Sequence, residues 1–166
     1  MVRMKYFLMG VLIAILGVAL AVIVYPSEER RVKKQFRLLS EWVSKSPEEN
    51  ALNLLQKMRD IGTLFSEPCE LKAPDESLSG GYTRQEISAF AGSARSHFSR
   101  IDLTFHDLHI DFPEREIAKV TLTARMVGSS TAGEQVDEIR ELECLLKKID
   151  SKWLFHQIEV VEVLKR

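Results

Sequence analysis

Hydrophobic residues follow three different patterns along the chain. Residues 6–25 form an unbroken apolar run without a charged side chain. Three segments between residues 29 and 100 repeat apolar positions every three or four residues, as amphipathic helices do. From residue 101 onward, apolar and polar positions alternate, as they do in half-buried strands. This order predicts an α+β domain in which helices pack on a mostly antiparallel sheet, preceded by an apolar N-terminal segment.

The apolar run is long enough to cross a lipid bilayer. Twenty helical residues span about 30 Å, and a tyrosine at each end suits the headgroup regions. We predict an uncleaved transmembrane anchor over residues 1–27, followed by one domain over residues 28–166. A cleaved signal peptide is the alternative, because residues 19–21 read Ala-Leu-Ala, but the chain stays apolar beyond that site.

Two rules give opposite orientations for this anchor. The basic cluster at residues 30–37 outnumbers Arg3 and Lys5, which favours a cytoplasmic domain. The short basic N-terminus resembles an export signal, however, and long domains can cross the membrane regardless of charge. We expect a single-pass protein of the inner membrane, held by residues 6–25, with a periplasmic or otherwise extracytoplasmic domain. The basic cluster is either a contact for anionic lipid or a solvated helix face.

The helical segments carry start signals. The first covers residues 29–45, with its main apolar positions four, three and four residues apart. The pattern predicts that the second begins at Ser46, with a capping box between Ser46 and Glu49. Thr83 and Glu86 form another capping box at the start of the third helix, which ends near Arg100.

The strands follow the helices. A short strand over residues 65–71 and a loop or irregular hairpin over residues 73–82 precede the third helix. Four long strands then cover residues 101–112, 115–127, 136–149 and 153–164, with a tight turn at residues 150–152. We expect a bulge near His106 and Asp107, because unbroken alternation would bury Asp107, His109 and Asp111 together, which only an active site would justify. A change of parity indicates another bulge near His156 or Gln157.

This order of elements resembles the nuclear transport factor 2-like superfamily, also called the cystatin-like or SnoaL-like fold. The likeness covers residues 29–164 and is carried by the third helix running into residues 101–108, and by the charged turn before Trp153. It implies a cone-shaped domain of three helices on a curved sheet. The superfamily includes isomerases, dehydratases, cyclases and non-catalytic binding modules, so the fold does not select a function.

Candidates for acid–base chemistry are few. They are His97, Asp107 and His156, and the alternative for each histidine is an ordinary surface or core position. Members that resemble ketosteroid isomerase use a pocket tyrosine, whereas the only tyrosine here outside the apolar run is Tyr82, in a predicted loop. Six apolar residues would line the interior of the cone, either as an open pocket or as a filled core: Trp42, Phe90, Leu103, Phe105, Leu122 and Trp153.

Other chemistry finds little support in the sequence. His106 and His109 fall on opposite faces of a strand, so we predict no metal site, and no phosphate loop or other cofactor motif occurs. Cys69 and Cys144 are either a disulfide or buried thiols. The chain has 23 basic and 24 acidic side chains, and only Arg3 and Lys5 among them precede residue 26. The rest of the chain therefore has a net charge of −3, which argues against nucleic-acid binding.

Two functions remain. The first is a membrane-anchored, non-catalytic binding or assembly module, since the layout is similar to the inner-membrane scaffold component of bacterial type IV secretion systems. Its partners would be an unknown protein and a second copy of the chain, met through the sheet face that bears Lys119, Thr121, Thr123 and Arg125. The second is a small-ligand carrier, or an acid–base isomerase or dehydratase, that uses the interior of the cone.

Overall fold

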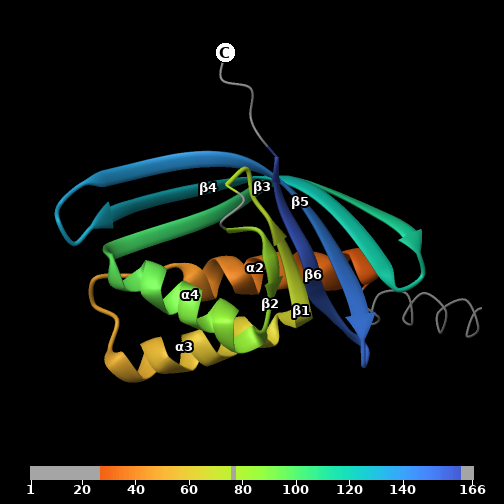
Figure 1. The fold of residues 1–166 in the computed structure, drawn as a ribbon, viewed down its shortest axis with the longest axis horizontal. Coiled ribbons are helices and arrows are strands. Elements are labelled where there is room, and N and C mark those ends of the chain that lie inside the picture. Colours follow the sequence, from red (N-terminus) through yellow and green to blue (C-terminus); the bar gives the residue numbers. More distant parts are fainter. Residues whose placement is uncertain (1–26, 76–77, 162–166) are drawn as a thin grey trace, which may run out of the picture. The chain divides into compact units, whose positions relative to one another are not determined.

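The computed structural model describes residues 27–75 and 78–161, and the predicted anchor lies outside them. From Val32 onward these residues belong to one compact unit. They form an α+β fold of three helices and six strands (Figure 1). In chain order the elements are α2 (Glu28–Val43), α3 (Ala51–Thr63), β1 (Phe65–Lys72), β2 (Gly80–Tyr82), α4 (Arg84–Ser96), β3 (Phe98–Glu114), β4 (Ile117–Ser130), β5 (Gln135–Ile149) and β6 (Lys152–Val161).

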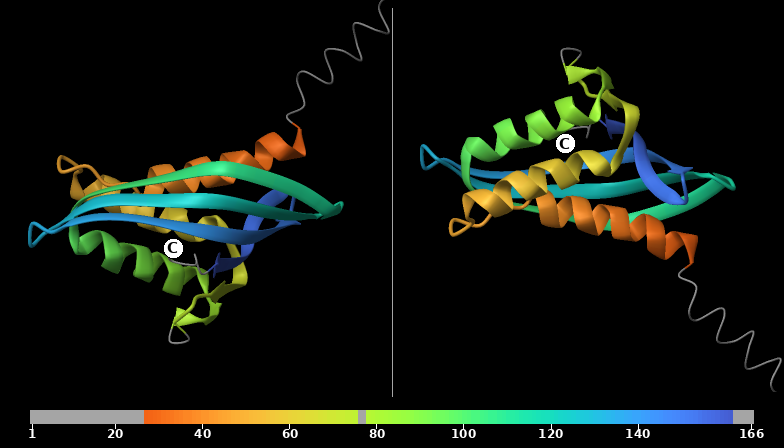
Figure 2. Two further views of the ribbon diagram at one scale, coloured as in Figure 1. Left: turned by 90° about the horizontal axis from the view of Figure 1, so that it is seen from above. Right: turned by 90° about the horizontal axis from the view of Figure 1, so that it is seen from below.

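The six strands form one mixed sheet. Their order is β2-β1-β6-β5-β4-β3, so β3 is an edge strand. Every neighbouring pair is antiparallel except β1 and β6, which run parallel, and the predicted mostly antiparallel sheet is confirmed. The helices lie on one face of the sheet, with α2 running beside β3 (Figure 2). No helix in the described part of the chain is long and apolar enough to cross a membrane.

Both predicted bulges are confirmed. His106 pairs with Thr123 and His109 with Thr121, so β3 holds one extra residue, and Asp107 adopts a positive φ of 55°. This turns Leu108 and Ile110 toward the core and leaves Asp107 exposed. In β6, the register with β5 shifts at His156. The tight turn is also confirmed, because Asp150 and Ser151 both have positive φ.

The helix boundaries differ from the predicted ones in three places. The second helix begins at Ala51, not at Ser46, because the Asn50 side chain caps it by accepting a hydrogen bond from the Asn53 N–H (2.9 Å). The first helix ends at Val43, since the following segment bonds to β3. The third keeps its predicted Thr83–Glu86 capping box but ends at Ser96, where β3 is about to begin.

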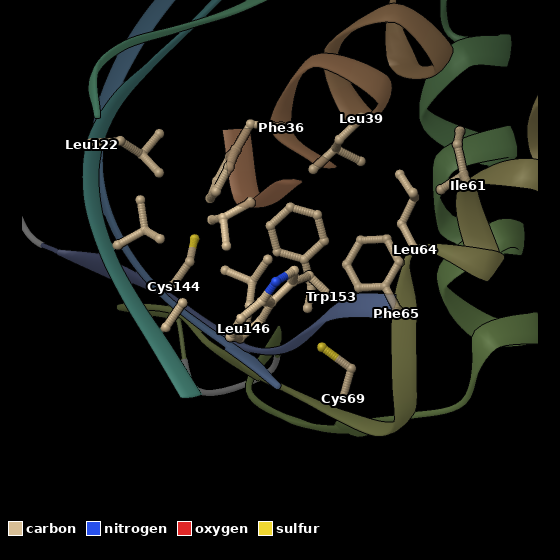
Figure 3. Packing of buried hydrophobic residues seen from close by; sticks show 14 of the residues in the cluster. Phe36, Leu39, Ile61, Leu64, Phe65, Cys69, Leu122, Cys144, Leu146 and Trp153 are labelled. Atoms are coloured by element: carbon tan, nitrogen blue, oxygen red, sulfur yellow. The ribbon is translucent and has the colours of Figure 1, made fainter. Parts of the chain in front are cut away.

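The space between the helices and the sheet is filled with apolar side chains. Trp153 and Phe155 on β6, Leu146 on β5 and Phe36 on α2 are all at most 2% exposed. The Phe36 ring meets the rings of Phe105 and Phe155 edge to face, at centroid distances of 5.5 and 5.0 Å. Figure 3 shows Trp153 in the middle of this cluster, among side chains from the helices and strands. The interior of the domain is therefore a packed core.

Candidate functional site

The three acid–base candidates lie on different elements, and no contact among the described residues joins them. His97 is exposed at the C-cap of α4, and Asp107 is exposed in the β3 bulge. His156 is half-buried on β6, where its Nδ1 lies 2.9 Å from the Ser66 hydroxyl. The three residues predicted from the sequence therefore do not come together in one acid–base site.

His156 and Ser66 form a histidine–hydroxyl pair at the boundary of the core. Ser66 is 3% exposed and its hydroxyl also donates to the Pro68 carbonyl oxygen (3.0 Å). Burial, together with the charge of Lys147, lowers the pKa of His156 despite the opposing effect of Glu70. The pair thus favours a neutral imidazole that links β6 to β1, and its shielded hydroxyl is poorly placed to meet a substrate.

The predicted lining residues fall into separate groups. Trp153 and Leu122 belong to the buried core, and Trp42 and Phe105 pack partly buried against it. Leu103 is half-buried on β3. Phe90 is 50% exposed and packs on Tyr82, at a ring-centroid distance of 5.3 Å, so it lies away from the interior.

The remaining chemical candidates are also isolated. Cys69 and Cys144 are both free thiols in the core, so the structure contains no disulfide between them. Burial is the main reason that the pKa of each thiol rises to about 12. His109 lies 3.5 Å from Asp111 on the surface, and no cluster of metal-binding side chains occurs within the described residues.

A groove between α2 and β3 forms an open hollow on the surface of the domain. Its volume is about 560 Å³. Lys33, Arg37 and Ser40 contribute from α2, and Thr104, His106 and Leu108 from β3, with Phe36 and Phe105 as its aromatic floor. We call this the α2/β3 groove. It combines an apolar floor with cationic and hydroxyl groups, which is the composition of a site for an anionic ligand.

A second, smaller hollow is on the face of the sheet opposite the helices. Its volume is about 390 Å³. Thr121 pairs with Glu143 and Thr123 with Glu141, on the parity opposite to buried Val120 and Leu122. Asp107 also lines this hollow. This predicted acid–base residue therefore borders an open hollow, but the hollow is outside the cone.

A buried cation joins the three helices at one end of the core. Arg95 on α4 is 1% exposed and donates from Nη1 to the carbonyl oxygens of Trp42, Val43 and Ser44 at the C-terminus of α2. Its Nη2 donates to Glu49, which precedes α3 and also binds Lys57 (2.7 Å). Burial alone would raise the pKa of Glu49, but these bonds and charges outweigh it and lower the pKa.

The sequence pattern missed both the α2/β3 groove and the Arg95 cluster. Lys33 and Arg37 belonged to the basic stretch, whose predicted roles were lipid contact or a solvated helix face, and nothing local connects them with Thr104 or His106. Arg95 lies eight residues after Ile87 and four after Ala91, on the buried side of α4, and a charged residue at this helical spacing from apolar residues was the one available signal.

Comparison with known proteins identifies structures that share this fold. No family model matches the chain, and no curated protein matches it either. Solved structures do match it. A proposed scytalone dehydratase from Novosphingobium aromaticivorans superposes with a TM-score of 0.65 at 20% identity, over 82% of this chain and 85% of that chain.

Two further structures give the same result at lower identity. A hexachlorocyclohexane dehydrochlorinase (LinA, type 2) has a TM-score of 0.64 at 8% identity, over 81% of this chain and 84% of its own. A proposed aromatic ring hydroxylase from Novosphingobium aromaticivorans has a TM-score of 0.67 at 11% identity, over 85% of this chain and 93% of its own. At such identities the likeness extends to the fold alone. The chain therefore has the nuclear transport factor 2-like α+β fold.

Proposed function

We propose that this protein is a membrane-anchored, non-catalytic binding or assembly module whose domain faces the extracytoplasmic side. The observation that carries the proposal is the filled interior. Trp153, Phe155 and Leu146 occupy the place where an enzyme of this fold would need an open pocket. The open hollows are instead on the surface, where a ligand or partner protein can reach them.

The anchor is part of the proposal because of the sequence of residues 6–25. This run has no charged side chain and is long enough to span a bilayer. A cleaved signal peptide is the main alternative to a transmembrane anchor for such a segment. The test is fractionation of cells that express the full chain with a C-terminal tag. We expect the full chain in carbonate-washed membranes, with its domain cleaved by protease added to the periplasmic side.

Deletion of residues 1–27 provides the matched control. Because the core closes within residues 32–161, the truncated chain should be soluble and unfold cooperatively. Recovery of the full chain in the soluble fraction with a shortened N-terminus would favour a cleaved signal and refute the anchor. Protection of the domain from periplasmic protease would refute the orientation.

Self-association through the open face of the sheet is a further part of the proposal. Lys119 pairs with Glu143 (2.7 Å) and Arg125 with Asp137 (2.9 and 2.7 Å). Arg125 lies opposite Ile139 and Asp137 opposite Val127, and these two apolar side chains are 53% and 37% exposed on the same face. A dimer that covers them should dissociate in Ile139→Glu, as measured by sedimentation of the truncated chain.

A control variant distinguishes loss of this sheet contact from a general effect of an added negative charge. Leu52 is 77% exposed on α3, away from the sheet, so Leu52→Glu should leave the sedimentation coefficient unchanged. A truncated chain that sediments as a monomer at all concentrations up to about 1 mM would overturn the proposed dimer, since even a weak dimer has a Kd in this range.

A small-ligand carrier or enzyme is the second candidate. It is favoured by the structural neighbours whose names include a dehydratase and a dehydrochlorinase, and by the volume of the α2/β3 groove. Elimination of water or HCl needs a base beside the substrate, and among the residues that line the groove His106 is the one suited to that role. Loss of a measured lyase activity in His106→Gln, with unchanged unfolding, would support this candidate against the first.

A further inference from the structure

We propose that the α2/β3 groove binds an extended acidic peptide segment of a partner protein, which adds to the sheet along the free edge of β3. The inference rests on the proposed binding function and names the chemistry of the partner. It starts from the position of β3, which is the last strand of the sheet and therefore has one edge without a neighbouring strand among the described residues.

The first part of that edge is already occupied by the chain itself. The N–H of Ile101 donates to the Lys45 carbonyl oxygen (3.1 Å), and the Ile101 carbonyl oxygen accepts from the Lys45 N–H (2.8 Å). The N–H of Leu103 donates to the Ser44 hydroxyl (3.0 Å), and its carbonyl oxygen accepts from the Ser40 hydroxyl (2.5 Å). The segment at the end of α2 therefore pairs with β3 much as a short strand would.

This pairing fixes the direction of the next backbone groups. In a strand, the N–H and C=O of residues two apart point to the same side. Since Ile101 and Leu103 point away from β4, Phe105 does so as well, because the bulge begins only after His106. No hydrogen bond from the described residues meets the N–H or C=O of Phe105. The groove thus has a backbone donor and acceptor at its wall.

The charges around this edge select the kind of peptide. Lys33 and Arg37 lie one turn apart on α2, and His106 lies on β3 with its Nε2 3.1 Å from the Thr104 hydroxyl. No acidic residue is among the described residues that line the groove. Arg37 supplies a cation and His106 a ring nitrogen for carboxylates, while Phe36 and Phe105 offer an apolar floor. Acidic and apolar side chains in alternation therefore match the groove.

The length of the groove sets the size of the segment. From Lys33 to Ser40, α2 advances about 10 Å, which an extended strand covers in about three residues. Three residues of backbone with one or two carboxylates are enough to meet Phe105 and Arg37 together. A free anionic amphiphile such as a fatty acid would meet the cations and the floor, but it would leave the Phe105 backbone groups unpaired.

The experiment measures fluorescence anisotropy of a labelled six-residue peptide that alternates valine and glutamate. The protein is the full chain in phosphatidylcholine nanodiscs, at low salt. We expect saturable binding that weakens at least tenfold in Arg37→Glu and at 0.5 M NaCl. Lys34→Glu is the matched control, because Lys34 is an exposed neighbour on α2 outside the groove, and it should change the Kd less than twofold.

Backbone pairing is tested with N-methylated peptides. Methylating alternate residues blocks one edge of the extended peptide, so one of the two alternate sets should lose binding at least tenfold and the other should keep it. Equal binding of both sets would overturn the proposal, as would equal binding of a valine–lysine peptide. Arg37-dependent binding of decanoate with no peptide binding would assign the groove to a small amphiphile instead. None of these outcomes alters the fractionation result, so failure of this inference is distinguishable from failure of the anchored module.

Discussion

Arg95 connects α2, α3 and α4 through one buried side chain, and its replacement by methionine tests how the helical layer is held together. Methionine keeps most of the side-chain volume but removes every hydrogen bond of the guanidinium. Three carbonyl oxygens at the C-terminus of α2 then lose their shared donor, and Glu49, whose side chain is 6% exposed, loses its buried cation.

The size of the stability loss depends on which member of the Arg95–Glu49 pair remains. Removing one member of a buried ion pair costs about 3–5 kcal/mol, because the other charge stays buried without compensation. In Arg95→Met, Lys57 still binds Glu49 (2.7 Å), which reduces this cost, while three carbonyl oxygens lose their donor, so we expect the free energy of unfolding to fall by about 3 kcal/mol. Glu49→Gln should cost less, about 1–3 kcal/mol, because the amide oxygen still accepts a hydrogen bond and Arg95 keeps its carbonyl partners. The double variant should cost less than the sum of the two.

The assay is urea unfolding of residues 28–166, followed by tryptophan fluorescence and circular dichroism. The pH dependence adds an independent check. The folded pKa of Glu49 lies below its ordinary value of 4.5, so its stabilising effect is present above that value and is lost as the pH falls through the folded pKa. The difference between wild type and Glu49→Gln should therefore shrink in acid. A loss below about 0.5 kcal/mol in Arg95→Met would refute the reasoning, because it would place the guanidinium in solvent.

Three further predictions concern the core. Trp153→Ala should destabilise the domain by about 3–5 kcal/mol in the same urea assay, and a change within about 0.5 kcal/mol would contradict the burial of this ring. The lowered pKa of His156 means that wild type should lose stability as the pH falls below the ordinary histidine value of 6.5, while His156→Gln should lack this step between pH 7 and 5. Cys69 and Cys144, with pKa values of about 12, should react with iodoacetamide at neutral pH only after denaturation, and fast native labelling followed by mass spectrometry would contradict this.

Two local motifs of the same type and spacing show where sequence reasoning succeeds and where it stops. Thr83 and Glu86 form the predicted capping box, because the Glu86 side chain has no stronger partner than the backbone at the helix start. Ser46 and Glu49 have the same spacing and form none. There the Glu49 carboxylate binds Arg95, which is 46 residues away in the chain. The Glu49 carboxylate could bind either the backbone at the helix start or the Arg95 guanidinium. The bond to the buried cation is the stronger one.

The same distinction explains why the bulge in β3 was predictable and the α2/β3 groove was not. Unbroken alternation would have buried Asp107 with its charge, so the cost of an unpaired carboxylate in the core already required an extra residue in the strand. The groove depends instead on where α2 stops relative to the edge of β3, which Ser40 and Ser44 set by binding the backbone of Leu103, about 60 residues onward. Serine in an amphipathic helix carries no signal of such a partner, since its hydroxyl bonds equally well to water. Surfaces that form between distant elements, like this one, therefore become visible only once the register of the strands and the ends of the helices are known.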